Sequence, residues 1–335
     1  MKYCLLFLSC FCFLNANAQI NNFERLDSIA RSTNAEQESS LNSLAVYFNS
    51  ISSSKEDLAR LVFTWVASHI KYDDDAFNTG KISNQDAPSI FLSRKAVCSG
   101  YSEVIKSLCD LLKLNCVIID GFGKGYGFKN GMPVNGINHS WNAIEFNNKW
   151  HLIDATWGSG YAENINGKAV SKFRFCDYWF DVNPKEFIFN HFPDSSKYQF
   201  LPKVYTREQF RKLIYVEANA VFAMGFSLDS LLLNIKANPN FQLPEVYNPG
   251  KIDFKFETLP MSKKLNSKST YNFKFISKST DETKFVLLNN NNLIEFEKSE
   301  DLKFIKNVNN LVPGMLHFGK LSDSQIEIII SYEVL

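Results

Sequence analysis

Residues 138–157 contain a histidine near their start, His139, and an aspartate near their end, Asp154. Aromatic and β-branched residues flank a central Asn-Asn pair, and asparagine tolerates the left-handed backbone of a two-residue hairpin loop. The segment is therefore predicted to form two antiparallel strands. In the register that this loop sets, Trp141 faces Asp154 and His139 faces Thr156, all on one face. His139 and Asp154 are then diagonal neighbours that a hydrogen bond can join, unless a β-bulge reverses the parity.

Cys98 precedes a segment in which apolar residues recur three and four positions apart, which predicts a helix over residues 99–113. The unpaired amides and the positive dipole end at a helix start favour the thiolate, and the same amides can bind an oxyanion. If His139 lies beside Cys98, the two can form a thiolate–imidazolium pair, and Asp154 can orient the ring. These residue types therefore suit acyl transfer through a thiol.

A metal site is the alternative for the same three residues, because thiolate, imidazole and carboxylate groups can all bind zinc. The sequence supplies no fourth ligand for such a site. Trp141 and Trp157 are near these residues in the predicted hairpin, and the sequence is compatible both with an acyl-binding groove and with core packing.

The segments before Cys98 must position it. Residues 20–51 have the spacing of two short helices, and a longer helix is predicted after Ser53 and Glu56, which resemble a capping box. Trp65 and His69 fall on the apolar stripe of this helix, so both are interpreted as core residues. Three consecutive aspartates, residues 73–75, lack the spacing of a calcium loop and are interpreted as a solvated turn.

The segments after the Cys98 helix are a buried strand, "CVIIDG", and a glycine-rich stretch over residues 121–136. No nucleotide-binding glycine spacing fits this stretch, so it is interpreted as a mobile surface loop at the mouth of a site. His191 precedes Phe192-Pro193 and is interpreted as structural.

The N-terminal eighteen residues have the layout of a cleaved secretory signal: a lysine, an apolar run and Ala-Asn-Ala. Cleavage is expected between Ala18 and Gln19, which predicts a secreted or periplasmic protein. Cys10 offers a lipid anchor as the alternative, although the apolar run before it is very short. No later segment reaches the ~18 apolar residues needed to cross a bilayer.

Charge and cysteine content limit the function classes further. With 36 basic and 35 acidic residues the net charge is +1, which gives no electrostatic footprint for nucleic acid. Four cysteines follow the signal segment, and an exported protein could join them in two disulfides. If Cys98 is a reactive thiol, at least one of the other three is unpaired as well. The four are Cys98, Cys109, Cys116 and Cys176.

The character of the sequence changes beyond residue 205. One helix is predicted over residues 208–217, and short alternating runs separated by Asn, Ser, Gly and Pro turns follow. This pattern predicts a β-sandwich over residues 206–335. Its only histidine is His317, so a binding or packing role is expected of it.

Four segments carry a family resemblance: "FTWVASHIKYDDDAF", "AVCSGYSEVIKSLCDLL", "NHSWNAIEFNNKWHLIDATWGSG" and "DYWFDVNPKEFIFNHFP". They resemble successive blocks of the transglutaminase-like superfamily, which is a circularly permuted relative of papain-like proteases, and in particular its kyphoscoliosis-peptidase branch. The resemblance covers about residues 60–200. It implies an α+β domain with an antiparallel sheet over residues 19–205, with its core in residues 55–200, followed by an Ig-like sandwich.

The resemblance also implies roles: Cys98 as the nucleophile, His139 as general base and acid, and Asp154 as the orienting carboxylate. Two positions depart from the family pattern, Ala96 where glycine is frequent and Ser99 where an acidic residue or glutamine is frequent. Neither belongs to the triad.

The expected function is that of an exported thiol enzyme that cleaves or transfers amide bonds through a thioester on Cys98. It could be a peptidase, a deamidase or a transglutaminase, with no cofactor and with a protein or peptide substrate such as a cell-wall peptide. The backbone N–H of Cys98 would help to bind the oxyanion. The alternative is a catalytically silent scaffold that binds a cell-wall or protein partner.

Overall fold

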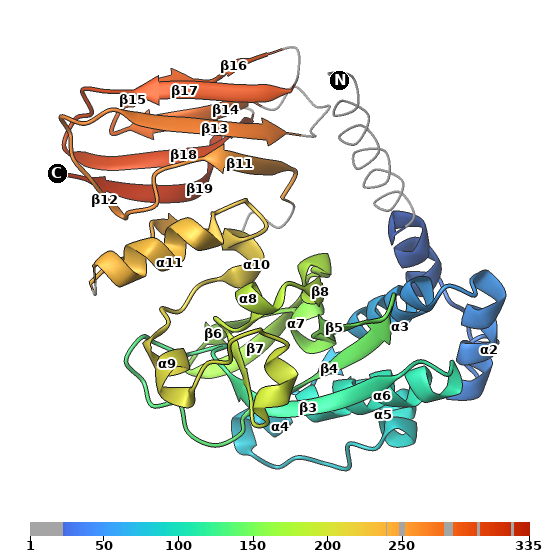
Figure 1. Cartoon of the computed structure of the whole chain (residues 1–335). Coiled ribbons are helices and arrows are strands. Elements are labelled where there is room, and N and C mark those ends of the chain that lie inside the picture. The colour runs from blue at the N-terminus through green and yellow to red at the C-terminus, as the bar shows by residue number, and fades with distance from the viewer. Residues whose placement is uncertain (1–22, 239, 248–251, 278–283, 300–301, 323–324) are drawn as a thin grey trace, which may run out of the picture. The chain divides into compact units, whose positions relative to one another are not determined.

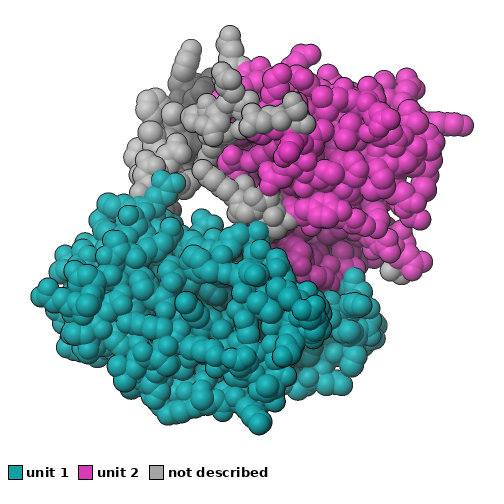
Figure 2. All heavy atoms as spheres, turned by 180° about the vertical axis from the view of Figure 1, so that it is seen from behind, with its two compact units in different colours: residues 1–212 teal, residues 213–335 magenta. Residues whose placement is uncertain are grey.

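The computed structural model describes residues 23–238, 240–247, 252–277, 284–299, 302–322 and 325–335. The chain divides into two compact units between Lys212 and Leu213, coloured separately in Figure 2. The sequence predicts a boundary after residue 205. In the structure the division comes after helix α9 (Arg207–Lys212), which therefore belongs to the first unit. The signal-peptide prediction lies outside the described residues. Within the described residues, no helix has the length and apolar content to cross a membrane.

A five-stranded antiparallel sheet, in the order β8-β5-β4-β3-β9, forms the centre of the first unit (Figure 1). Helix α6 (Cys98–Leu111) packs its apolar stripe on β3 and β4, and α3 and α5 pack on α6. This mixed arrangement confirms the expected α+β fold. The sheet strands are β3 (Cys116–Gly123), β4 (His139–Phe146), β5 (Lys149–Ile153), β8 (Phe180–Val182) and β9 (His191–Pro193).

The remaining elements of this unit surround the sheet. The first described helix covers residues 23–31. It is followed by α2 (Leu41–Ile51), α3 (Lys55–His69), β1 (Lys71–Tyr72), α4 (Asp74–Thr79), α5 (Ala87–Ser93), β2 (Lys95–Ala96), α7 (Ala155–Gly158), β6 (Gly160–Ile165), β7 (Lys168–Phe173), η1 (Asp177–Trp179), α8 (Pro184–Phe187) and η2 (Ser196–Gln199).

Helix α3 has the core role that the sequence predicted for it. The Trp65 side chain is completely buried and stacks on His69. The N-cap, however, is Ser54, whose hydroxyl accepts from the Asp57 amide, so the expected capping box at Ser53 and Glu56 is wrong by one residue. A run of three serines explains the error, because each has the side chain that an N-cap needs.

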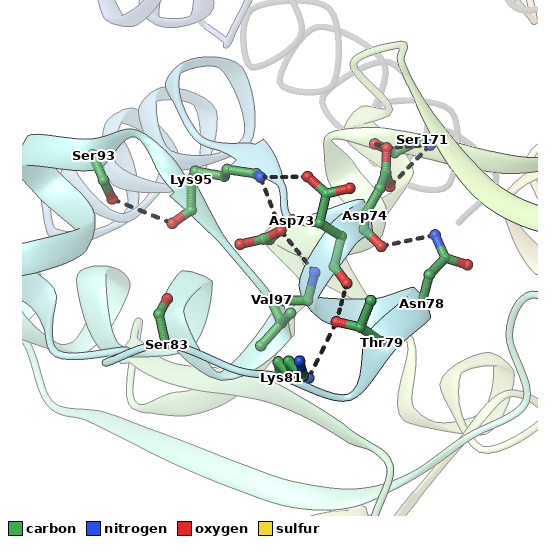
Figure 3. Close-up of polar contacts among 12 residues, drawn as sticks. Asp73, Asp74, Asn78, Thr79, Lys81, Ser83, Ser93, Lys95, Val97 and Ser171 are labelled. Atoms are coloured by element: carbon green, nitrogen blue, oxygen red, sulfur yellow. Dashed lines mark hydrogen bonds and ion pairs between the residues drawn. The ribbon is translucent and has the colours of Figure 1, made fainter.

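The three consecutive aspartates after β1 do not form the solvated turn that the sequence predicted. Asp73 caps α4 by accepting from the Ala76 amide, and it pairs with Lys95 at 3.0 Å. Asp74 accepts from the backbone and hydroxyl of Ser171 on β7, each at 3.1 Å. Figure 3 shows the Asp73–Lys95 and Asp74–Ser171 contacts, which join the start of α4 to β2, just before Cys98, and to β7. Only Asp75, with a 93% exposed side chain, matches the expectation.

The second unit is the β-sandwich that the sequence predicted. A six-stranded sheet in the order β10-β19-β18-β14-β15, with β12 paired in parallel to β19, faces a four-stranded sheet in the order β11-β13-β17-β16. Phenylalanine rings from both sheets meet between them, such as Phe275 of β13 and Phe285 of β14 at 4.8 Å. The strands are β10 (Glu245–Val246), β11 (Phe254–Thr258), β12 (Lys264–Leu265), β13 (Tyr271–Ser277), β14 (Lys284–Asn289), β15 (Asn292–Glu295), β16 (Glu297–Lys298), β17 (Lys303–Val308), β18 (Gly314–Ser322) and β19 (Gln325–Val334).

The helix predicted over residues 208–217 is present but shorter than expected. Helix α9 ends at Lys212, because the residues that follow, Ile214 to Val216, are β-branched or aromatic and are poor helix formers. Two further helices, α10 (Ala218–Val221) and α11 (Leu228–Ala237), come before the first strand of the sandwich. Ser227 caps α11 by accepting from the Ser230 amide, a signal that the sequence contained.

Candidate active site

Cys98 is the first residue of α6, at the end of a short connection from β2. The N-cap is Val97, which has no polar side chain with which to cap the helix. The Val97 backbone N–H donates to Gln85 at 3.0 Å, and this bond fixes the turn that presents the thiol. The Cys98 side chain therefore lies at the positive end of the helix, beside first-turn amides that have no side-chain cap.

His139 opens β4, and its Nε2 lies 2.7 Å from Asp154 Oδ2. The ladder between β4 and β5 follows the predicted register from the Phe146–Lys149 pair up to the Asn142–Ile153 pair, and it ends there. His139 and Asp154 thus meet although they lie beyond the paired part of the hairpin.

Asp154 is not on a strand, and this part of the hairpin prediction is wrong. The chain leaves β5 after Ile153 and turns into α7, and Asp154 is the N-cap of that helix. Its Oδ1 accepts from the Trp157 amide at 3.0 Å, which leaves Oδ2 for His139. Thr156 consequently lies in a helix and not opposite His139. Aspartate is a preferred N-cap residue, and this local preference overrides continuation of the strand.

The charges of this group favour a thiolate–imidazolium pair. Burial raises the pKa of the Cys98 thiol, but hydrogen bonding to His139, the positive charge of His139 and the Ser140 backbone amide together lower it below its usual value. Burial lowers the pKa of His139, but Asp154 and Cys98 raise it to about 10. Since Nε2 is bonded to Asp154, Nδ1 is the ring nitrogen left for Cys98.

A second histidine on the same carboxylate was not anticipated from the sequence. His191 is completely buried, and its Nε2 lies 2.9 Å from Asp154 Oδ2. Strand β3 lies between β4 and β9, with Gly121 paired to His139 and Gly123 paired to His191. The sequence places His191 in an "FNHFP" motif, where the adjacent Phe-Pro pair favours a structural interpretation.

Alternate glycines of β3 and the residues after it make room for the rings of the site. A Cβ at Gly121 would lie 2.6 Å from Trp141, one at Gly123 would lie 3.1 Å from His139, and one at Gly125 would lie 3.0 Å from Trp157. Strand β3 continues two residues beyond the predicted strand "CVIIDG", so the expectation of a surface loop is wrong for residues 122 and 123. The period of two is the period at which strand residues share a face.

The two tryptophans of the hairpin segment have different surroundings. Trp141 is 1% exposed and packs edge-on against Phe187, so it is a core residue. Trp157 is half-buried and stacks on the His139 ring, with 5.2 Å between ring centroids. The partly exposed Trp157 ring therefore lies directly beside His139.

Tyr72 also lies near the start of α6. It pairs with Ala96, two residues before Cys98, and its ring contacts that of Tyr101 in the first turn of the helix. Burial raises the pKa of the Tyr72 phenol, and the nearby Cys98 raises it further. The phenol is therefore protonated at neutral pH and can donate a hydrogen bond.

The zinc alternative is not supported with Cys98 as a ligand. Within the described residues, the donor atoms close enough to share an ion belong to His139, Asp154 and His191. These atoms already bond to one another, because Asp154 Oδ2 accepts from both rings. Among the described cysteines, Cys98, Cys109 and Cys116 are not joined in disulfides.

Residues 42–155 match the family model of the transglutaminase-like superfamily, and this segment includes Cys98, His139 and Asp154. It is a transglutaminase-like domain. The superfamily to which this domain belongs includes cysteine peptidases and transglutaminases, and the match confirms the expected family.

The chain is also similar to curated proteins over more than half of its length. It is 30% identical over 194 residues to the kyphoscoliosis peptidase of Mus musculus, an alignment that covers 58% of this chain and 29% of that protein. It is 26% identical over 211 residues to Hillarin of Drosophila melanogaster, which covers 58% of this chain and 25% of that protein. The chain thus spans less than a third of the length of these two relatives.

One solved structure that is similar to this chain is that of a putative cysteine protease from Cytophaga hutchinsonii. It aligns with a TM-score of 0.28 and 21% identity, over 37% of this chain and 39% of that one. A TM-score this low adds nothing to the fold assignment.

Proposed function

We propose that the transglutaminase-like domain is a thiol enzyme that cleaves or transfers amide bonds through a thioester on Cys98. The observation that supports this best is the juxtaposition of three groups. A thiol with a lowered pKa lies at a helix start, an imidazole with a raised pKa lies beside it, and a buried carboxylate holds that imidazole. These are the requirements for an activated thiol nucleophile.

In the proposed reaction the Cys98 thiolate attacks the amide carbonyl carbon and forms a carbon–sulfur bond. The carbonyl electrons move onto the oxygen, which the backbone N–H of Cys98 stabilises. When this intermediate collapses, the carbon–nitrogen bond breaks, and His139 gives its proton to the leaving amine. The products of this half-reaction are a thioester and a free amine or ammonia.

The second half-reaction regenerates the thiolate. His139, now neutral, accepts a proton from a water molecule as the water oxygen attacks the thioester carbonyl. The carbon–sulfur bond then breaks, a carboxylic acid leaves, and His139 is again an imidazolium. If an amine attacks in place of water, the product is a new amide, which is a cross-link.

The proposed substrate is a protein or peptide, and a cell-wall peptide is one such substrate for an exported enzyme. Export is proposed because the first eighteen residues have the layout of a secretory signal. Trp157, half-buried and stacked on His139, is the side chain that we propose to contact the acyl chain of the substrate.

The test is turnover by the exported chain, whose N-terminal residue is expected to be Gln19 when it is read by mass spectrometry. Wild type is compared with Cys98→Ala and His139→Ala on a peptide library, on glutamine-containing peptides and on these peptides with a primary amine. We expect product from wild type and none from Cys98→Ala. His139→Ala should lose at least about 100-fold, the usual contribution of a general acid–base. If wild type releases no more product than Cys98→Ala on all three substrate sets, the domain is a silent scaffold.

A further inference from the structure

The Asp154 carboxylate accepts three hydrogen bonds, and only one of them comes from the proposed general base. Oδ1 accepts from the Trp157 backbone amide, and Oδ2 accepts from the Nε2 atoms of both His139 and His191. Asp154 is completely buried, so these donors replace the water that would otherwise solvate its charge. His191 is thus one of two side chains that solvate this carboxylate.

Four aromatic rings surround His191 on its other sides. The His191 ring stacks on Phe187 with 3.8 Å between centroids and an angle of 14°. The rings of Trp157, Trp141 and Trp179 lie at 4.3, 5.0 and 5.4 Å. In such surroundings a second positive charge is costly, and burial lowers the pKa of His191 to about 4. At neutral pH the ring is therefore uncharged, and its Nε2 has the proton because it faces a carboxylate.

We propose that His191 is a positioning residue, which holds Asp154 through the Nε2–H···Oδ2 hydrogen bond and shares the carboxylate charge with His139. This proposal deepens the proposed function, because it concerns the same Cys98–His139 pair. A neutral donor on Oδ2 fixes the rotation of the carboxylate and offsets part of its charge. The remaining charge is enough to orient His139 but pulls less strongly on its proton.

The charge of Asp154 acts on both members of the pair in the same direction. It raises the pKa of His139, and it also raises the pKa of Cys98 by repulsion of the thiolate. The titratable groups near His191 are Asp154 and His139, and those near Cys98 are His139, Asp154 and Tyr72. Removal of the His191 donor exposes more of the Asp154 charge, so both pKa values should rise together.

Alkylation of Cys98 can measure both pKa values without a substrate. Iodoacetamide reacts with the thiolate, so its rate rises as Cys98 ionises. Iodoacetate is an anion that the imidazolium attracts, so its rate relative to iodoacetamide falls as His139 loses its proton. We would measure both rates over the pH range from about 4 to about 11, in a Cys176→Ser background. Among the cysteines that the structure describes, that background removes the one besides Cys98 that is not buried.

Two replacements of His191 form the critical comparison. His191→Phe keeps a ring on Phe187 but removes the donor. The low-pH limb of the alkylation profile reports the pKa of Cys98, and the high-pH limb reports the pKa of His139. We expect both limbs to move to higher pH by about one unit, a tenfold change for one lost hydrogen bond. His191→Gln has an amide nitrogen near the position of Nε2 and should return both limbs to the wild-type values. If His191→Phe does not fold, His191→Asn serves instead, because its shorter amide does not reach Oδ2.

The inference is overturned if neither limb moves in the variant that lacks the donor. It is also overturned if His191→Gln shifts the limbs as much as His191→Phe does, because the ring would then act by packing alone. The same conclusion follows if loss of His191 raises the pKa of Cys98 but lowers that of His139, so that the pH range between the two limbs becomes narrower. His139→Ala is the control and should abolish the low-pH limb. A wild-type profile with one limb near the ordinary thiol pKa of about 8.5 would instead contradict the proposed function. If the wild-type profile shows a lowered Cys98 pKa and a raised His139 pKa but no turnover is found, the proposed function fails while the positioning role of His191 still stands.

Discussion

Tyr72 adds a donor at the start of the helix that carries Cys98. Its pairing with Ala96 and its contact with Tyr101 place the phenol beside the first turn of α6, and its raised pKa keeps it protonated. A thioester mechanism needs a second donor for the oxyanion besides the Cys98 amide. The Tyr72 hydroxyl is the side-chain donor that these contacts support.

Tyr72→Phe should therefore lower kcat by about 100-fold, the cost of removing one oxyanion donor, with a smaller change in KM. Alkylation of Cys98 should stay near the wild-type rate, because the groups that shift the pKa of the Cys98 thiol are His139, the Ser140 amide and Asp154. Tyr101→Phe is the matched control: it removes a hydroxyl that donates to the Ile70 carbonyl at 2.7 Å in the interior. That change should cost about 1 kcal/mol of stability and leave kcat near wild type. Equal kcat values for Tyr72→Phe and wild type would rule out the oxyanion role.

The residues that could be found from the sequence are those whose local context identifies them. Cys98 is followed by a helical apolar pattern, and His139 and Asp154 bracket a recognisable hairpin. His191 could not be found in this way, because it reaches Asp154 from 37 positions away in the chain. Their contact depends on the sheet order β4-β3-β9, which is a non-local property of the fold. The position of His191 directly before a Phe-Pro pair favours a structural interpretation instead.

At the level of elements, β3 is the spacer that holds the two histidine-bearing strands at the correct distance. It pairs with β4 through Gly121–His139 and with β9 through Gly123–His191. The absence of side chains at these glycines lets rings and backbone approach closely. A Cβ at Gly121 would lie 2.3 Å from the Phe192 carbonyl oxygen, whereas the three atoms nearest to one at Gly123 belong to the His139 side chain, at 3.1 to 3.2 Å.

Alanine at these two glycines should therefore have different effects. Gly123→Ala forces the His139 ring to move by a few tenths of an ångström, so Cys98 alkylation at pH 6 to 7 should slow about tenfold, with about 1 kcal/mol of lost stability. Gly121→Ala forces the backbone of β9 to move and should cost about 3 kcal/mol. Urea denaturation and alkylation rates measure both effects. Unchanged alkylation in Gly123→Ala would show that the His139 ring has room to spare.

The hairpin shows why elements were easier to predict than their ends. The strands and their register follow from the period of two and from the loop residues, and both are confirmed as far as the Asn142–Ile153 pair. The sequence could not show that the second strand stops there, because Asp154 is equally compatible with a strand face and with an N-cap. Asp154 acts as an N-cap because its carboxylate accepts a hydrogen bond from the Trp157 amide of α7.

At the scale of the whole molecule, the chain has two separate cores, and the chemistry that we propose lies in one of them. The sandwich core contains phenylalanine rings from both sheets, among them Phe275. This ring lies 4.8 Å from Phe285 of the facing sheet and 4.8 Å from Phe304 of its own sheet. The sequence predicted this unit from alternating runs alone, since period-two patterns need no information from distant residues.

Separate cores predict separate unfolding. Phe275 is completely buried, so Phe275→Ala should remove about 3 to 5 kcal/mol from the stability of the sandwich through lost contacts and the cavity left behind. Ile305→Ala, at a 48% exposed position on the outer face, is the control and should change stability by less than about 0.5 kcal/mol. Urea unfolding followed by circular dichroism should show one transition moved to lower urea and the other unchanged. The Cys98 alkylation rate in native buffer should equal that of wild type, because the thiol belongs to the other core. If both transitions move together, or if alkylation of Cys98 slows, the sandwich stabilises the first unit and the two units unfold as one cooperative structure.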